Sequence, residues 1–232
     1  MPKKKKIIRK WAPYISFVSS HPDFSAKKYN LQDNLTLSFY NEDLWSSHQL
    51  EAGTYVATGK KNKLKLGLAY MHTSQFVQYR NPRSAQDLID FGVSTFNGWG
   101  DFYEHRRLMF ASGFRQYVFK GFFIEPSLSL AFNISKPVNE IFLGTNAANA
   151  VYQPLFNTAK NLNRTTLFGS VSIGYEYKGF FAGFFYEQNL SPVTHQFTFR
   201  GNSNNIKYEH WINRGIKLGY ILDVDKLKGR AK

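Results

Sequence analysis

Two polar residues, His72 and Ser74, stand two positions apart in the segment YMHTSQF at residues 70–76. In a β-strand, residues two apart project from the same face, so the imidazole would lie beside the serine. A histidine that takes the proton of a serine hydroxyl turns that serine into a nucleophile for acyl transfer. The spacing therefore makes His72 and Ser74 candidates for hydrolytic chemistry, and the competing interpretation is an ordinary polar rim above a bilayer.

Other kinds of chemistry have no recognisable motif in this chain. The sequence contains no P-loop, dinucleotide fingerprint, zinc signature or serine-hydrolase elbow. It has no cysteine, which excludes a disulfide framework, a thiolate metal site and a cysteine nucleophile. We therefore expect no metal and no cofactor, and we see no motif for a nucleic-acid partner.

The His-x-Ser arrangement resembles that of outer-membrane lipid A 3-O-deacylases, small eight-stranded barrels whose catalytic residues lie on the outside wall. The resemblance implies that His72 is a general base for Ser74 and that a glutamate orients His72. Gln75 stands where that family typically has Asn, and Glu104 is a conceivable glutamate partner. The face that would carry both residues continues an apolar row, made of Leu64, Leu66, Leu68 and Tyr70.

The elements that would position these residues are strands with two unlike faces. Apolar and polar residues alternate most clearly over residues 122–134, and the pattern returns over 166–177 and 214–224. Alternation with period two predicts β-strands. We expect eight such segments, at roughly 11–20, 48–58, 64–80, 104–119, 122–136, 165–177, 180–193 and 213–224.

The connections between these segments alternate between long and short. Short ones fall at 59–63, at Lys120-Gly121 and at Lys178-Gly179, and the long ones are about 21–47, 81–103, 137–164 and 194–212. A soluble closed barrel such as a lipocalin has no reason to sort its loops in this way, whereas outer-membrane barrels have short periplasmic turns and long extracellular loops. The predicted fold class is therefore all-β: an eight-stranded antiparallel up-and-down transmembrane β-barrel in the bacterial outer membrane, with both termini periplasmic.

The composition agrees with strands in which only every second residue faces lipid. Aromatic residues make up 17% of the chain, yet the mean hydropathy is −0.40, and no run of about 18 apolar residues could form a membrane helix. Glycine in each Lys-Gly pair supplies the positive φ that a two-residue hairpin needs. Around these turns we expect an aromatic girdle at the membrane boundary, formed by Trp11, Tyr117, Phe119, Phe122, Tyr177 and Phe180.

Charged residues occupy the faces that would point into the barrel. Eight strands enclose room for side chains but not for a wide channel, and ions in such a lumen must pair or be hydrated. We expect a salt-bridged plug with small water pockets, and a narrow solute pore is the alternative. The expected members of this polar network are Glu51, Lys65, Arg107, Arg115, Glu125, Glu176, Glu187 and Lys217.

The formal net charge of +14 favours an anionic partner. Basic residues gather at the predicted periplasmic end, where they could contact lipid headgroups or cell wall, or simply keep the turns soluble. We expect outer-membrane lipid and lipopolysaccharide as partners, with an envelope protein complex as a further one. The expected organisation is a basic periplasmic segment at 1–10, a barrel at 11–224 and a basic tail at 225–232. The start, MPKKKKIIRKW, lacks the apolar region and cleavage site of a secretory signal peptide.

Three stretches, KWAPYISFVSSHPDFS, SSHQLEAGTYVATGKKNKLKLGLAYMHTSQFV and IGYEYKGFFAGFFYEQNLSPV, are similar to the small outer-membrane barrel domains of Bacteroidota, and in particular to the barrel of dual-membrane anti-sigma factors. The resemblance implies a signalling chain in which cytoplasmic and inner-membrane parts precede the barrel. We therefore expect a non-enzymatic membrane anchor or sensor, or a subunit of an envelope assembly. The alternatives are a lipid A deacylase-like acyl hydrolase using His72 and Ser74, and the narrow pore.

Overall fold

The structure is a computed structural model that describes residues 11–23, 29–30, 36–40, 47–80, 98–135, 162–194, 197–199, 202–206 and 210–222. The expected basic segment at 1–10 and the tail at 225–232 lie outside these ranges, as do most residues of the long connections. Every described regular element is a β-strand. No helix in these ranges is long and apolar enough to cross a bilayer.

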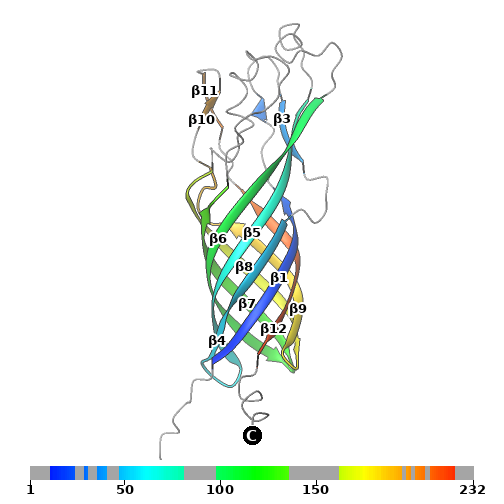
Figure 1. Cartoon of the computed structure of the whole chain (residues 1–232), viewed down its shortest axis with the longest axis vertical. Helices are drawn as coiled ribbons and strands as arrows, with labels where there is room; N and C mark the ends of the chain where they lie inside the picture. The colour runs from blue at the N-terminus through cyan, green and yellow to red at the C-terminus, as the bar shows by residue number, and fades with distance from the viewer. Residues whose placement is uncertain are drawn as a thin grey trace, which may run out of the picture.

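Eight antiparallel strands form a closed barrel, because the last pairing joins β5 to β6 and completes the ring. Figure 1 shows these strands tilted around the barrel axis. The eight are β1 (Trp11–Asp23), β4 (Ser47–Ala57), β5 (Asn62–Arg80), β6 (Gly98–Phe119), β7 (Phe122–Asn133), β8 (Thr165–Tyr177), β9 (Phe180–Asn189) and β12 (Ile212–Ile221). The predicted eight-stranded antiparallel barrel is therefore confirmed, with strand ends within a few residues of those expected except at the start of β6 and the end of β9.

The pairing register fixes the tilt of the strands. A line of paired residues starts at Ile221 on β12, crosses to Tyr14 on β1, and continues strand by strand to Asn189 on β9. From Asn189 the line returns to Trp211, directly before β12, where the Trp211 backbone carbonyl accepts from the backbone N–H of Asn189. One circuit of the barrel along paired residues therefore leads from Ile221 to Trp211, a stagger of ten residues. In an eight-stranded barrel, a stagger of this size corresponds to strands tilted by roughly 40° from the barrel axis.

β5 and β6 continue beyond the other barrel strands, as Figure 1 shows at the top of the view. Their pairing runs as far as Arg80 opposite Gly98, whereas β4 leaves β5 at Thr73. Above that point β3 (Thr36–Tyr40) pairs with β5, and β2 (Tyr29–Asn30) pairs with β3. A separate hairpin is made by β10 (Phe197–Phe199) and β11 (Asn202–Ile206). Because its partner strand is long, β6 begins six residues earlier than its own alternation predicts.

The two Lys-Gly turns differ in backbone geometry. At the β8–β9 turn both Lys178 and Gly179 have positive φ, at 50° and 92°, as a type I′ hairpin requires. At the β6–β7 turn Gly121 has a φ of 97°, whereas the φ of Lys120 is not positive. There the β6–β7 register shifts by one residue between Tyr117 and Phe119, a bulge that goes with a single left-handed glycine.

Five of the six expected girdle residues lie on the outward face at the turn end of the barrel. Trp11, Phe119, Phe122, Tyr177 and Phe180 are between 53% and 67% exposed. Tyr117 is different, and its expected place in the girdle is wrong. It lies two residues after the buried Arg115, so the alternation turns its ring inward, where its hydroxyl donates to Glu176. The register shift that follows then brings Phe119 to the outside.

Candidate functional site: the lumen and the outer wall

The lower lumen, on the side of the short turns, holds a dense ion-pair network. Arg115 Nε donates to Glu125 Oε2 at 2.6 Å, and neither side chain is exposed. Lys217 Nζ lies 3.1 Å from Glu125 Oε1 and 3.5 Å from Glu51 Oε2. Lys65 Nζ bridges the same two carboxylates, at 2.9 Å from Glu51 and 3.4 Å from Glu125. Three cations thus share two buried carboxylates, so each charge has more than one partner.

Further contacts extend the network to the turn end. Arg115 Nη1 lies 3.0 Å from Glu176 Oε2, and Lys63 Nζ lies 3.3 Å from Glu176 Oε1. Tyrosine hydroxyls supply the remaining donors: Tyr14 to Glu51, Tyr55 to Glu125 and Tyr117 to Glu176. With Lys63 included, four cations meet three carboxylates. A buried charge is tolerated when it is paired and hydrogen-bonded in this way.

Aromatic rings pack among the ion pairs toward the turn end. A buried cluster of Tyr14, Tyr55, Phe123, Phe181 and Ile221, called here the lower cluster, fills this level. The Arg115 guanidinium stacks on two of these rings, 3.8 Å from the centroid of Phe123 and 4.3 Å from that of Phe181. The arginine therefore belongs both to the charged network and to the apolar seal.

The upper lumen is sealed by a second apolar group. This upper cluster contains Ala69, Met71, Met109, Ala131, Leu162, Phe168, Val193 and Trp211. Arg107 stacks on Trp211, with its guanidinium carbon 3.5 Å from the ring centroid. Glu187 accepts from Asn213 Nδ2 at 2.9 Å, and Asn213 accepts from the Trp211 indole at 3.2 Å.

The structure brings six of the eight expected lumen residues into one network: Glu51, Lys65, Arg115, Glu125, Glu176 and Lys217. Arg107 and Glu187 are buried as well, but they lie at the level of the upper cluster. No ion pair joins either of them to another charged group within the described ranges. The expectation that all eight form a single salt-bridged plug is therefore wrong for these two, because Trp211 and Asn213 take the place of ionic partners.

The outward face is apolar where the inward face is charged. Phe180 and Phe184 are 67% and 78% exposed, whereas Glu125 and Lys217 are 1% and 2% exposed. The outward row of β7, continued by one residue past its end, is Phe122, Ile124, Pro126, Leu128, Leu130, Phe132 and Ile134. At a tilt of roughly 40° this row is roughly 30 Å tall, close to the apolar band of membrane barrels.

The chain is a membrane-spanning β-barrel. A protein in water would expose its charges and bury these rings, and so large a continuous apolar surface needs hydrocarbon around it.

The upper border of the apolar face on β1, β4, β5 and β6 is marked by four polar residues in direct register, called here the rim row. They are Ser19, His48, His72 and Arg106, each paired with the next across neighbouring strands. Ser19 Oγ lies 3.3 Å from His48 Nδ1. Ser74 and Glu104, which pair with one another, lie one outward position above the row.

The candidate hydrolytic residues belong to this border. His72 Nε2 lies 3.6 Å from Glu104 Oε2, and Arg106 Nη2 lies 2.6 Å from the same oxygen. Glu104 is therefore the glutamate beside His72. Between Ser74 and His72, both in the described part of the chain, there is no hydrogen bond. The structure thus assembles the histidine with its carboxylate and leaves the serine outside that pair.

No protein-family model and no curated protein matches the chain. Among solved structures, it is similar to the outer membrane protein AlkL, determined by solid-state NMR in DMPC lipid bilayers. That match has a TM-score of 0.48 and 10% identity, and it covers 96% of this chain and 95% of AlkL. The chain is also similar to the NanC porin, with a TM-score of 0.32 and 8% identity over 89% of this chain and 98% of that one.

Sequence reasoning missed several residues that complete the lumen. Tyr14 and Tyr55 donate to the central carboxylates, and Trp211 and Asn213 occupy the upper lumen. The signal for the tyrosines was present, because each lies an even number of positions from an inward residue on its own strand. Trp211 carried no such signal, since it lies just before the first residue of β12.

Proposed function

We propose that the chain is a bacterial outer-membrane barrel with a closed lumen, which serves as a membrane anchor or sensor in the cell envelope. The observation that carries this proposal is the filling of the lumen at both ends of the barrel. The ion-pair network around Glu125 and the lower cluster fill the lumen together toward the turn end, and the upper cluster fills it toward the opposite end. A solute would have to break paired ions and displace rings, so a narrow pore is disfavoured.

Conductance in planar bilayers tests this proposal. The wild-type protein, inserted beside a channel-forming porin as the positive control, should add no current steps. The sensitivity control is a quadruple variant, Glu51→Ser with Lys65→Ser, Trp211→Ala and Phe123→Ala, which removes a neutral ion pair and part of both the upper and the lower cluster. It should give small steps. Discrete current steps from the wild-type protein would contradict the closed lumen and favour the narrow pore.

The turn end is the periplasmic end in this proposal, because bacterial barrels keep their short turns there. Lys60, Lys61, Lys120 and Lys178 lie in or beside these turns, and a basic rim suits anionic headgroups or an acidic partner in the envelope. Resemblance to the barrels of Bacteroidota anti-sigma factors supports the same role, in which a barrel anchors a signalling chain. Lipopolysaccharide and an envelope complex are the partners that this role implies.

The second candidate function is acyl hydrolysis at the rim, and the contact between His72 and Glu104 favours it. In this proposal Ser74 attacks an ester carbonyl of a lipid while His72 takes the serine proton, and Glu104 stabilises the imidazolium. The ester C–O bond then breaks, His72 gives the proton to the departing alcohol, and water hydrolyses the acyl-serine ester to release the fatty acid. Release of fatty acid from lipopolysaccharide would be measured for the wild-type protein and for Ser74→Ala. Equal release excludes the hydrolase, and release that depends on Ser74 would displace the non-enzymatic role.

A further inference from the structure

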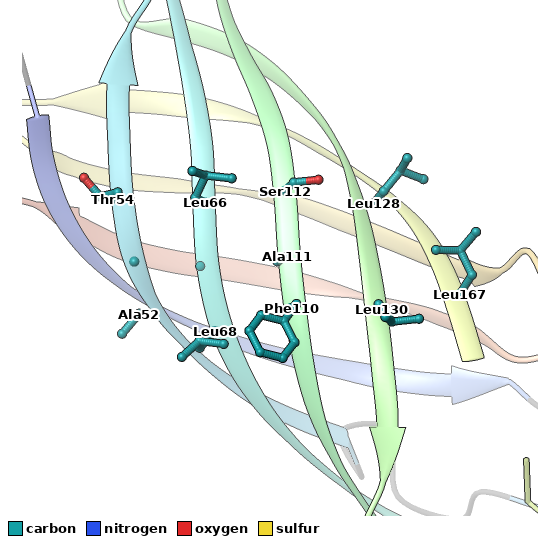
Figure 2. Close-up of a pocket in the computed structure, with 12 residues that line it drawn as sticks. Ala52, Thr54, Leu66, Leu68, Phe110, Ala111, Ser112, Leu128, Leu130 and Leu167 are labelled. Atoms are coloured by element: carbon teal, nitrogen blue, oxygen red, sulfur yellow. The ribbon is translucent and has the colours of Figure 1, made fainter. Parts of the chain in front are cut away.

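A shallow hollow of about 610 Å³ lies on the outer wall of the barrel, within the apolar face. Its floor is low because β4, β5 and β6 place small residues there. Figure 2 shows Ser112 between Leu66 and Leu128, with Ala52 and Thr54 at the edge of the hollow. The larger residues that line it are Leu66 and Leu68 on β5, Phe110 on β6, Leu128 and Leu130 on β7, and Leu167 on β8. This hollow, called here the wall groove, faces hydrocarbon, so its occupant is an apolar chain.

The wall groove and the rim row share two strands. Leu66 pairs with Ser112 in the groove, and six residues further along the same two strands His72 pairs with Arg106 in the rim row. With strands tilted by roughly 40°, six residues rise by roughly 15 Å. That rise is about half of a hydrocarbon core of roughly 30 Å. A lipid whose headgroup lies at Arg106 would therefore bring its acyl chain into the groove at the bilayer midplane.

The polar end of this path offers both signs of charge. Arg106 is 46% exposed and Glu104 is 55% exposed at their side chains, and they contact through Glu104 Oε2. Glu104 Oε1 makes no bond to any residue in the described ranges. A guanidinium binds phosphate and a free carboxylate oxygen accepts from an ammonium group. The pair is thus complementary to a headgroup that carries a phosphate beside a primary amine.

We propose that β5 and β6 form a binding site for one phosphoethanolamine lipid. Arg106 and His72 donate to its phosphate, Glu104 accepts from its ammonium group, and one acyl chain fills the wall groove. This site uses only the outer wall, so it does not depend on the closed lumen proposed above.

Native mass spectrometry of the detergent-solubilised full chain tests the site. The probes are phosphatidylethanolamine, phosphatidylglycerol and phosphatidylcholine with identical myristoyl chains, so they differ only in the headgroup. The wild-type protein should bind one phosphatidylethanolamine roughly tenfold more tightly than either other lipid, as expected for one charge-assisted hydrogen bond. Equal binding of all three lipids, or binding of none, would overturn the assignment.

Matched variants separate the two halves of the site. Ala52→Phe fills the groove and should weaken all three lipids about equally, whereas Ala182→Phe, on the outward face of β9, should leave binding within about twofold. Glu104→Gln should abolish the preference for the amine, and Arg106→Gln should weaken all lipids roughly tenfold. Arg214→Gln is the control for charge, because Arg214 also faces outward near an acidic residue, 3.9 Å from Asp23. If the Ala52→Phe variant binds the lipids as tightly as the Ala182→Phe variant does, the acyl chain does not occupy the groove. If Glu104→Gln keeps the preference for the amine, Glu104 does not contact the headgroup.

Discussion

Lys217 reaches across the lumen to Glu125, and its ammonium nitrogen lies 3.1 Å from the carboxylate oxygen Oε1. The two residues are 92 positions apart in the chain, on β12 and β7, which are not neighbours in the barrel. Their side chains are 2% and 0% exposed, and Lys217 also lies 3.5 Å from Glu51. One lysine therefore ties three strands together at a place where a lone carboxylate would be costly.

Replacing Lys217 with Met should destabilise the barrel by about 3 kcal/mol, because two buried carboxylates lose a shared cation. The unfolding transition in urea and the temperature of the heat-induced gel shift both measure this loss. Lys120→Met, at an exposed turn, is the matched control and should leave both unchanged. A gel shift of Lys217→Met at the wild-type temperature would show that Lys65 and Arg115 suffice for the carboxylates.

Gly179→Ala should destabilise the β8–β9 hairpin by roughly 1–2 kcal/mol. Gly179 has a φ of 92°, and an added Cβ would lie 2.6 Å from the Ile221 carbonyl oxygen. Gly59→Ala is the control, because its Cβ would meet nothing closer than Asn62 Nδ2 at 4.0 Å. Urea unfolding of both variants compares them directly. Equal stability would mean that the turn relaxes without cost.

The barrel was predictable from the sequence because two regular patterns run along the chain: the alternation of apolar and polar residues, and the alternation of short and long connections. Alternation sorts each strand into two faces, and the parity of the loops orders the strands. The register was not predictable, since a shift by two residues preserves every face. Contacts that depend on register, such as Lys217 with Glu125 or His72 with Glu104, were therefore not predictable either. The inward position of Tyr117 was predictable, because Tyr117 lies two residues after the inward-facing Arg115. The bulge between Tyr117 and Phe119, which brings Phe119 to the lipid face, was not predictable.

The two tryptophans at opposite faces provide a test of which surface meets hydrocarbon. Trp11 is 60% exposed in the girdle, whereas Trp211 is 1% exposed inside the barrel. The chain has four tryptophans, so single-tryptophan variants are made by changing the other three to Phe. In brominated lipid vesicles, Trp11 fluorescence should be strongly quenched by bromines placed near the headgroup, and Trp211 should be protected. Equal quenching of both would contradict a sealed barrel in lipid.

Orientation in the envelope follows from labelling the two ends of the barrel. The chain has no cysteine, so a single introduced thiol reports its own position. Lys178→Cys places the thiol in the β8–β9 turn, and Arg164→Cys places it at an exposed position beside the opposite end of β8. If short turns face the periplasm, a membrane-impermeant maleimide added to intact cells should label Arg164→Cys and spare Lys178→Cys. Both thiols should react after the outer membrane is permeabilised, which controls for accessibility. Labelling of Lys178→Cys in intact cells would place the basic turns outside the cell and remove the basis for a periplasmic partner.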